Sequence, residues 1–219
     1  MNYQQTHAFL SELAENNNKQ WFDANRKRYE DVKADWVTTI GEIIKAIATF
    51  DEPIGELEPK NCTFRINRDV RFSKDKSPYK TNLGAIMSKG GKKSVRAGYY
   101  IQIDPKETFL ASGIWMPESP LLFKIRQEID YHFDEFRQIV EAKTFVSKFG
   151  KLESDKLVSV PKGFDKESPA AEYVKYKSFV GSKKFDISIV AELDFVPKMA
   201  EYFKISKPLN DFLDRALGG

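Results

Sequence analysis

The residues best suited to binding or catalysis lie in a basic segment, residues 65–80, whose sequence is RINRDVRFSKDKSPYK. An arginine guanidinium binds a carboxylate or phosphate through two parallel hydrogen bonds, and lysines add longer-range attraction. The spacing of these cations therefore predicts an anion-binding or phosphate-binding site built from Arg65, Arg68, Arg71, Lys76 and Lys80.

The same basic segment also fits a purely structural role. An unpaired arginine is costly to bury, so each guanidinium needs an anion or water. Asp69 and Asp75 lie within the segment and, with acids from neighbouring helices, could form an internal ion-pair frame. In that case the functional site lies elsewhere, for example beside residues 115–118. The sequence leaves both interpretations open.

An enzyme that acts on a phosphorylated or carboxylated substrate is a further interpretation. Asp69 would be its acid or base and Tyr79 its proton donor, while the surrounding cations hold the substrate. Those cations would also keep Asp69 ionised. No reaction follows from this arrangement, so the sequence does not decide whether the chain is an enzyme.

Charge is distributed unevenly along the chain. Residues 60–96 carry 11 Lys or Arg and two Asp, a local charge of +9, whereas the remainder carries 24 basic and 30 acidic residues. Cations interleaved with aromatic rings are typical of nucleic-acid or polyanion binding, because bases stack on the rings. The rings in question are Phe64, Phe72, Tyr79, Tyr99 and Tyr100. Against this alternative, the net charge of +3 is small for a protein dedicated to nucleic acid.

Few other residues could hold a metal or a cofactor. His7 and His132 are the only histidines, and Cys62 is the only cysteine, so neither a cysteine-based zinc site nor an internal disulfide is expected. The sequence GGKKS at residues 90–94 lacks the earlier glycine of a phosphate-binding loop. We therefore expect no metal and no cofactor.

The chain shows no pattern of a membrane or secreted protein. Its first residues lack a signal-peptide pattern, and no stretch approaches the ~18 apolar residues that span a bilayer. We therefore expect a cytoplasmic protein without membrane contact. The oligomeric state cannot be predicted, and the partner we expect is a phosphate-containing ligand or nucleic acid.

Helical patterns occur near both ends of the chain and strand patterns between them. Apolar spacing predicts a short helix capped by Thr6 and further helices at 20–50, 119–142 and 195–217. Alternation predicts an antiparallel meander with strands at 63–67, 83–88, 97–104 and 108–115, and then strands at 157–160 and 178–180 around a helix at 170–175. Because regular strand–helix alternation is missing, we predict one α+β domain over residues 1–219, an antiparallel sheet flanked by N-terminal and C-terminal helices.

The basic segment resembles the signature of a known family. The matching pattern is Arg65-x-x-Arg68-Asp69-x-Arg71-Phe72-x-x-x-Lys76-x-Pro78-Tyr79-Lys80, and the match extends to residues 17–22, 25–26, 98–100, 113–118, 161–164 and 175–179. This pattern is similar to that of the domain-of-unknown-function-2461 family, a family of uncharacterised bacterial proteins. The resemblance implies the length of the chain and the place of the motif, but no activity or catalytic residue. Similar sequences often carry a histidine where this chain has Gln102, so no general base is implied there.

Overall fold

Asparagines mark the ends of the N-terminal helices in the computed structural model, which describes residues 1–152 and 154–218. Helix α1 (Tyr3–Glu15) buries the predicted apolar face, formed by Phe9, Leu10 and Leu13. Its cap is Asn2, whose side chain accepts the amide of Gln5 at 3.1 Å. The prediction that Thr6 caps this helix is wrong, because Thr6 lies inside α1 and is fully buried.

The predicted helix over residues 20–50 is divided into α2 (Lys19–Ala24) and α3 (Arg26–Ala48). Asn18 caps α2 by accepting the Trp21 amide at 3.0 Å, and the side chain of Asn25 donates to the Trp21 carbonyl at 2.9 Å. These side-chain amides satisfy backbone groups that a continuous helix would have paired internally. The chain therefore breaks at Asn25 although the apolar spacing continues.

Shorter elements follow α3, and longer helices close the chain. The 3-10 helix η1 (Glu52–Glu56) and α4 (Pro59–Cys62) each have a proline in the first turn. The later helices are α5 (Ser119–Tyr131), α6 (Phe133–Val140), α7 (Lys143–Phe149), the 3-10 helix η2 (Ile187–Ala191) and α8 (Phe195–Ala216). The predicted helix over 119–142 breaks at His132, whereas α8 continues through Pro208.

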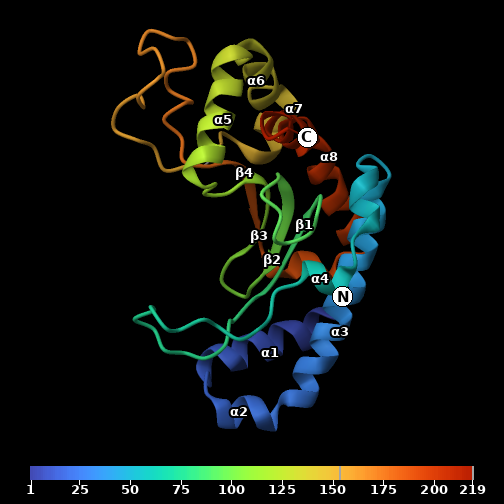
Figure 1. Ribbon diagram of the computed structural model, residues 1–219. Coiled ribbons are helices and arrows are strands. Elements are labelled where there is room, and N and C mark those ends of the chain that lie inside the picture. The colour runs from blue at the N-terminus through green and yellow to red at the C-terminus, as the bar shows by residue number, and fades with distance from the viewer. Residues whose placement is uncertain (153, 219) are drawn as a thin grey trace. The chain divides into compact units, whose positions relative to one another are not determined.

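Four strands form one antiparallel sheet in the order β1-β2-β3-β4 (Figure 1). They are β1 (Leu83–Ser88), β2 (Gly98–Ile103), β3 (Thr108–Ile114) and β4 (Phe179–Phe185). On β2, alternate side chains are fully buried, as the pattern predicts: Tyr99, Ile101 and Ile103. The predicted α+β class, with an antiparallel sheet between N-terminal and C-terminal helices, is confirmed.

The region between α7 and β4 is less regular than predicted. Residues 157–160 form no strand, and residues 170–175 form turns instead of a helix. An isolated antiparallel bridge joins Lys156 to Tyr176. The strand predicted at 178–180 is the beginning of the longer β4.

The chain forms two compact units. The first comprises Met1–Met87, Tyr100–Leu110 and Lys184–Ala200, and the second comprises Ser88–Tyr99, Ala111–Lys183 and Glu201–Gly219. The single domain over residues 1–219 therefore stays a prediction. Within the described part of the chain, no helix is long and apolar enough to cross a membrane.

Candidate anion-binding site

The basic segment forms an irregular hairpin between α4 and β1, in the first unit (Figure 1). The Lys80 amide donates to the Ile66 carbonyl at 2.7 Å, and the Arg68 amide donates to the Pro78 carbonyl at 2.9 Å. Two isolated bridges, from Thr63 to Ala85 and from Asn67 to Tyr79, replace the strand predicted at 63–67. This backbone pairing brings the two ends of the segment, residues 65 and 80, close together.

Tyr79 anchors the hairpin to the N-terminal helices. Its ring stacks on Phe22 with the ring centres 4.0 Å apart, and 6% of the residue is exposed. The side chain of Asn17 accepts the Tyr79 amide at 3.0 Å and donates to the Tyr79 carbonyl at 2.9 Å. Tyr79 therefore holds the base of the hairpin in place.

Arg68 and Asp75 close the tip of the hairpin. They form an ion pair, and Arg68 also donates to the Ser77 carbonyl at 3.3 Å. Asp75 accepts the hydroxyl and the amide of Ser77 at 2.6 and 2.9 Å. These bonds from Ser77, and then the bond from Arg68, hold the pKa of Asp75 far below its usual value. Arg68 is therefore already paired with an anion of the segment itself.

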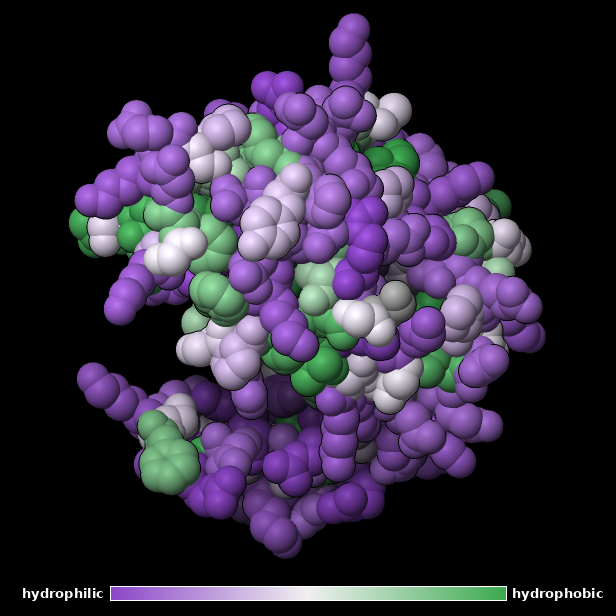
Figure 2. Space-filling view, turned by 45° about the horizontal axis from the view of Figure 1, so that its top comes forward, coloured by the Kyte–Doolittle hydropathy of each residue, from purple (hydrophilic) through white to green (hydrophobic). Residues whose placement is uncertain are grey.

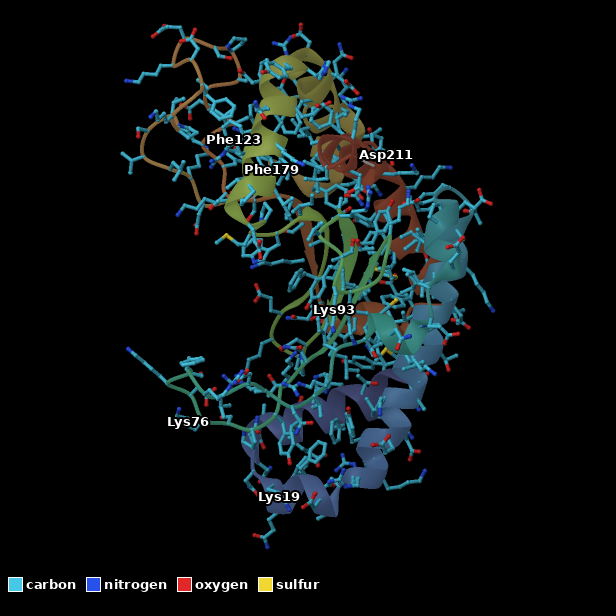
Figure 3. The ribbon with its side chains drawn as sticks, viewed as in Figure 1. Lys19, Lys76, Lys93, Phe123, Phe179 and Asp211 are labelled. Carbon is cyan, nitrogen blue, oxygen red and sulfur yellow. The ribbon has the colours of Figure 1, made fainter. Side chains whose placement is uncertain are left out.

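Arg71 and Lys76 also have partners within the segment. Arg71 donates two hydrogen bonds to Asp69, at 2.9 and 2.6 Å. The bonds from Arg71, and then the charge of Arg65, hold the pKa of Asp69 below its usual value. Lys76, labelled on this loop in Figure 3, donates to the Val70 carbonyl at 3.0 Å. An ion-pair frame thus occupies the tip of the hairpin.

Arg65 and Lys80 differ from the other cations of the segment. In the residues that the structure describes, neither forms a salt bridge. The Lys80 ammonium lies 5.1 Å from the centre of the Phe64 ring. Burial, and then the charge of Arg65, lower the pKa of Lys80. The base of the hairpin therefore holds two neighbouring cations without an acidic partner of their own.

Aromatic rings lie beside these two cations. The ring centre of Tyr100 is 6.3 Å from that of Phe64 and 5.5 Å from that of Phe109. A Cβ on Gly84 would lie 2.9 Å from the Tyr100 hydroxyl, so a larger residue there would push this hydroxyl aside. The hydroxyl donates to the side chain of Gln102 at 3.0 Å, and burial raises the pKa of Tyr100. These rings supply an apolar surface next to the positive charge.

A family model described as a conserved hypothetical protein (DUF2461) matches residues 5–212 of the chain. The chain belongs to the DUF2461 family. No curated protein and no solved structure matches it. The DUF2461 match includes the whole hairpin and the aromatic residues beside it, but it assigns no ligand to them.

The two catalytic candidates of this DUF2461 chain lie in different surroundings. Asp69 is exposed and held by Arg71, with Arg65 close enough to influence its pKa. Tyr79 is packed against Phe22 and is almost inaccessible. The hairpin does not bring the two side chains to a shared accessible position, and their catalytic roles stay predictions.

Sequence reasoning overlooked Gly84 and Phe109 as parts of this site. Gly84 lies on β1 and Phe109 on β3, on the same face as Tyr100, and the alternation along these two strands was the signal that could have found them. Within residues 1–152 and 154–218, no three His, Cys, Asp or Glu side chains are grouped so that they could hold a metal ion.

Proposed function

We propose that this chain binds a small phosphorylated or carboxylated ligand through Arg65 and Lys80. The observation that supports this function is that, among the described residues, neither of these two cations at the base of the hairpin forms a salt bridge. Asp69 interacts with the charge of Arg65, but its hydrogen bonds come from Arg71, at 2.9 and 2.6 Å. An oxyanion supplies the charge that the protein itself does not place there.

The aromatic surface favours a ligand with a flat or apolar body. Phe64 contacts both Lys80 and Tyr100, so a ligand held by its anionic group would lie against these rings. The Tyr100 hydroxyl and the Gln102 side chain lie in the same surface, where they would hydrogen-bond polar groups of such a ligand. A phosphorylated aromatic compound therefore fits the site better than phosphate alone.

The charge of Lys80 links binding to pH. Because burial and Arg65 lower the pKa of Lys80, the free protein loses this charge at a lower pH than an ordinary lysine does. An anion favours the charged form and raises that pKa again, so binding takes up protons in the alkaline range. Affinity therefore falls as the pH rises through the lowered pKa of free Lys80.

Calorimetric titration tests the proposal. The probes are inorganic phosphate, ribose 5-phosphate and adenosine monophosphate, added to the unaltered chain and to Arg65→Ala and Lys80→Ala. We expect each substitution to weaken binding roughly tenfold or more, since each removes one charged contact. Adenosine monophosphate should bind more tightly than ribose 5-phosphate, and Phe64→Ala should abolish that difference.

Lys74→Ala is the matched control, because it removes one positive charge from the same segment while Arg71 still holds Asp69. It should leave binding within about twofold of the unaltered chain. Equal losses in all three variants would mean that only overall charge matters, and unchanged binding in Lys80→Ala would refute the assigned site. Thermal melting checks that each variant remains folded.

A nucleic-acid surface at the hairpin tip is a second candidate, because of Phe72. This ring is 96% exposed, and the Arg71 guanidinium lies 5.9 Å from its centre. On the face shown in Figure 2, hydrophobic residues form small patches among hydrophilic ones. Unpaired bases stack on rings in such surroundings.

Binding of a fluorescent single-stranded oligonucleotide tests the second candidate. Phe72→Ala should weaken binding roughly tenfold, because one stacked base is lost, and affinity should fall steeply as salt rises. Phe123→Ala, which removes an exposed ring of the second unit, is the control. If neither added salt nor Phe72→Ala weakens binding, nucleic-acid binding at the hairpin tip is excluded.

A further inference from the structure

Arg126, on α5 in the second unit, is a buried cation that pairs with no carboxylate of the described residues. Only 8% of the residue is exposed. Its Nη2 donates to the Tyr176 carbonyl at 2.9 Å, and its buried Nε has no hydrogen-bond partner. Burial lowers the pKa of Arg126, and in the described part of the chain no carboxylate pairs with it. A guanidinium has several N–H donors, so most of its binding capacity is unused.

Acidic residues of the same helix are bound elsewhere. Asp130, one turn after Arg126, accepts the hydroxyl of Ser168 at 2.7 Å. Glu128 accepts a hydrogen bond from Arg215 at 2.6 Å. The protein therefore has carboxylates near Arg126 in the sequence but directs them to other donors. A buried cation that is left unpaired in this way costs stability, which favours a role for its charge.

We propose that Arg126 binds a small oxyanion, a phosphate or a carboxylate, at a site in the second unit. Among the described residues the Nη1 atom makes no hydrogen bond, and it is not one of the buried polar atoms without a partner, so it retains some contact with solvent through which an anion would bind. An oxyanion there accepts hydrogen bonds from the guanidinium and supplies the missing negative charge.

The loop that holds Arg126 adds positive charge to this site. Tyr176 lies between Lys175 and Lys177, and the Lys156 ammonium is 4.7 Å from the centre of the Tyr176 ring. Lys156 and Lys175 share one acid, Glu172, at 3.8 and 2.5 Å. The surroundings of the Tyr176 carbonyl thus retain a positive excess that attracts an anion.

An apolar surface lies one turn away on α5. Phe123, labelled in Figure 3, is 42% exposed. Its ring meets that of Phe164 edge-on with centres 5.6 Å apart. An anionic ligand with a small apolar part could contact these rings. A purely structural hydrogen bond to the Tyr176 carbonyl needs only one neutral donor. The buried charge of Arg126 therefore indicates an anionic partner.

Nitrogen-15 NMR of the arginine Nε–H signals tests the oxyanion site directly. The chain carries Arg65→Ala and Lys80→Ala, which removes the other proposed anion site, and keeps Arg126. Its Nε–H signal is identified by through-bond experiments and by its absence from Arg126→Lys. Sodium phosphate and sodium acetate are added separately, and sodium chloride at matched ionic strength is the control.

We expect the Arg126 signal to shift saturably at millimolar phosphate, acetate or both, and not with chloride. A response to phosphate alone assigns a phosphate site, and a response to acetate as well extends it to carboxylates. No response to either salt, or the same response to chloride, overturns the proposal and leaves Arg126 as a structural tie. The readout does not depend on whether Arg126→Lys folds, because the titrated chain retains Arg126.

Discussion

Arg65 and Arg68 lie three residues apart and carry the same charge, but their surroundings give them different capacities to bind an external anion. Arg68 is bound to Asp75 and to the backbone of the hairpin tip. Arg65 makes no salt bridge in the described residues, and its charge acts on Lys80. An external anion that binds Arg68 must displace an ion pair, whereas one that binds Arg65 relieves repulsion. The pairing of each cation, more than the charge of the segment, therefore selects the candidate ligands.

Gly113 is the residue with the tightest steric requirement in the second unit. It has φ +130°, and a Cβ at this position would lie 2.0 Å from the Phe179 carbonyl oxygen. Gly113→Ala therefore combines backbone strain with a clash against the backbone of β4. We expect a loss of about 4 kcal/mol or more in the free energy of unfolding, measured by urea denaturation.

Gly91→Ala separates the cost of backbone strain from that of the steric clash, because Gly91 has φ +86° but no atom within 4 Å of the Cβ position. Strain alone should cost about 1 kcal/mol there. Similar losses in the two variants would show that strand β4 moves away easily and that the close approach at Gly113 is not a constraint.

The individual residues of the site were predictable only in part. Residue type and spacing predict that residues 65–80 attract anions, but they do not reveal which cations are paired. Asp75 reaches Arg68 only because the hairpin folds back, which is a tertiary effect. Arg126 illustrates the same limit, because a charged residue next to the apolar stripe of a helix is expected to be exposed.

At the scale of elements, long amphipathic helices were predictable and their breaks were not. The apolar stripe of α3 has the expected spacing, but Asn25 and His132 interrupt two predicted helices without interrupting the pattern. Side-chain hydrogen bonds decide the break at Asn25, and apolar periodicity carries no information about them. Helices as short as α4 and α7 contain too few turns for a periodic signal.

Strands were predictable where one face is buried. Alternation on β2 corresponds to alternate burial, because a strand that packs on one side has period two. Residues 157–160 also looked like a strand, but Val158 is fully exposed and no neighbouring strand pairs with this stretch. Sequence preference without a partner strand therefore leaves an irregular loop.

At the scale of the whole chain, the two compact units do not correspond to two stretches of sequence. The chain crosses between them several times, and each of the four strands contributes residues to both units. A linker that could join two independent domains is absent from the described residues. Separate unfolding of one unit would require every strand to lose its pairing over part of its length.

We therefore expect a single cooperative unfolding transition, which agrees with the prediction of one domain. Native-state hydrogen exchange checks this in α3 of the first unit and α5 of the second. The slowest amides of both helices should report the same free energy of opening, with the same dependence on urea, since both exchange through global unfolding. Free energies that differ by more than about 1 kcal/mol, with different urea slopes, would show that the units unfold separately. Gly113→Ala makes the comparison sharper, because it perturbs only the second unit: in a cooperative chain it lowers the opening free energy of α3 as much as that of α5.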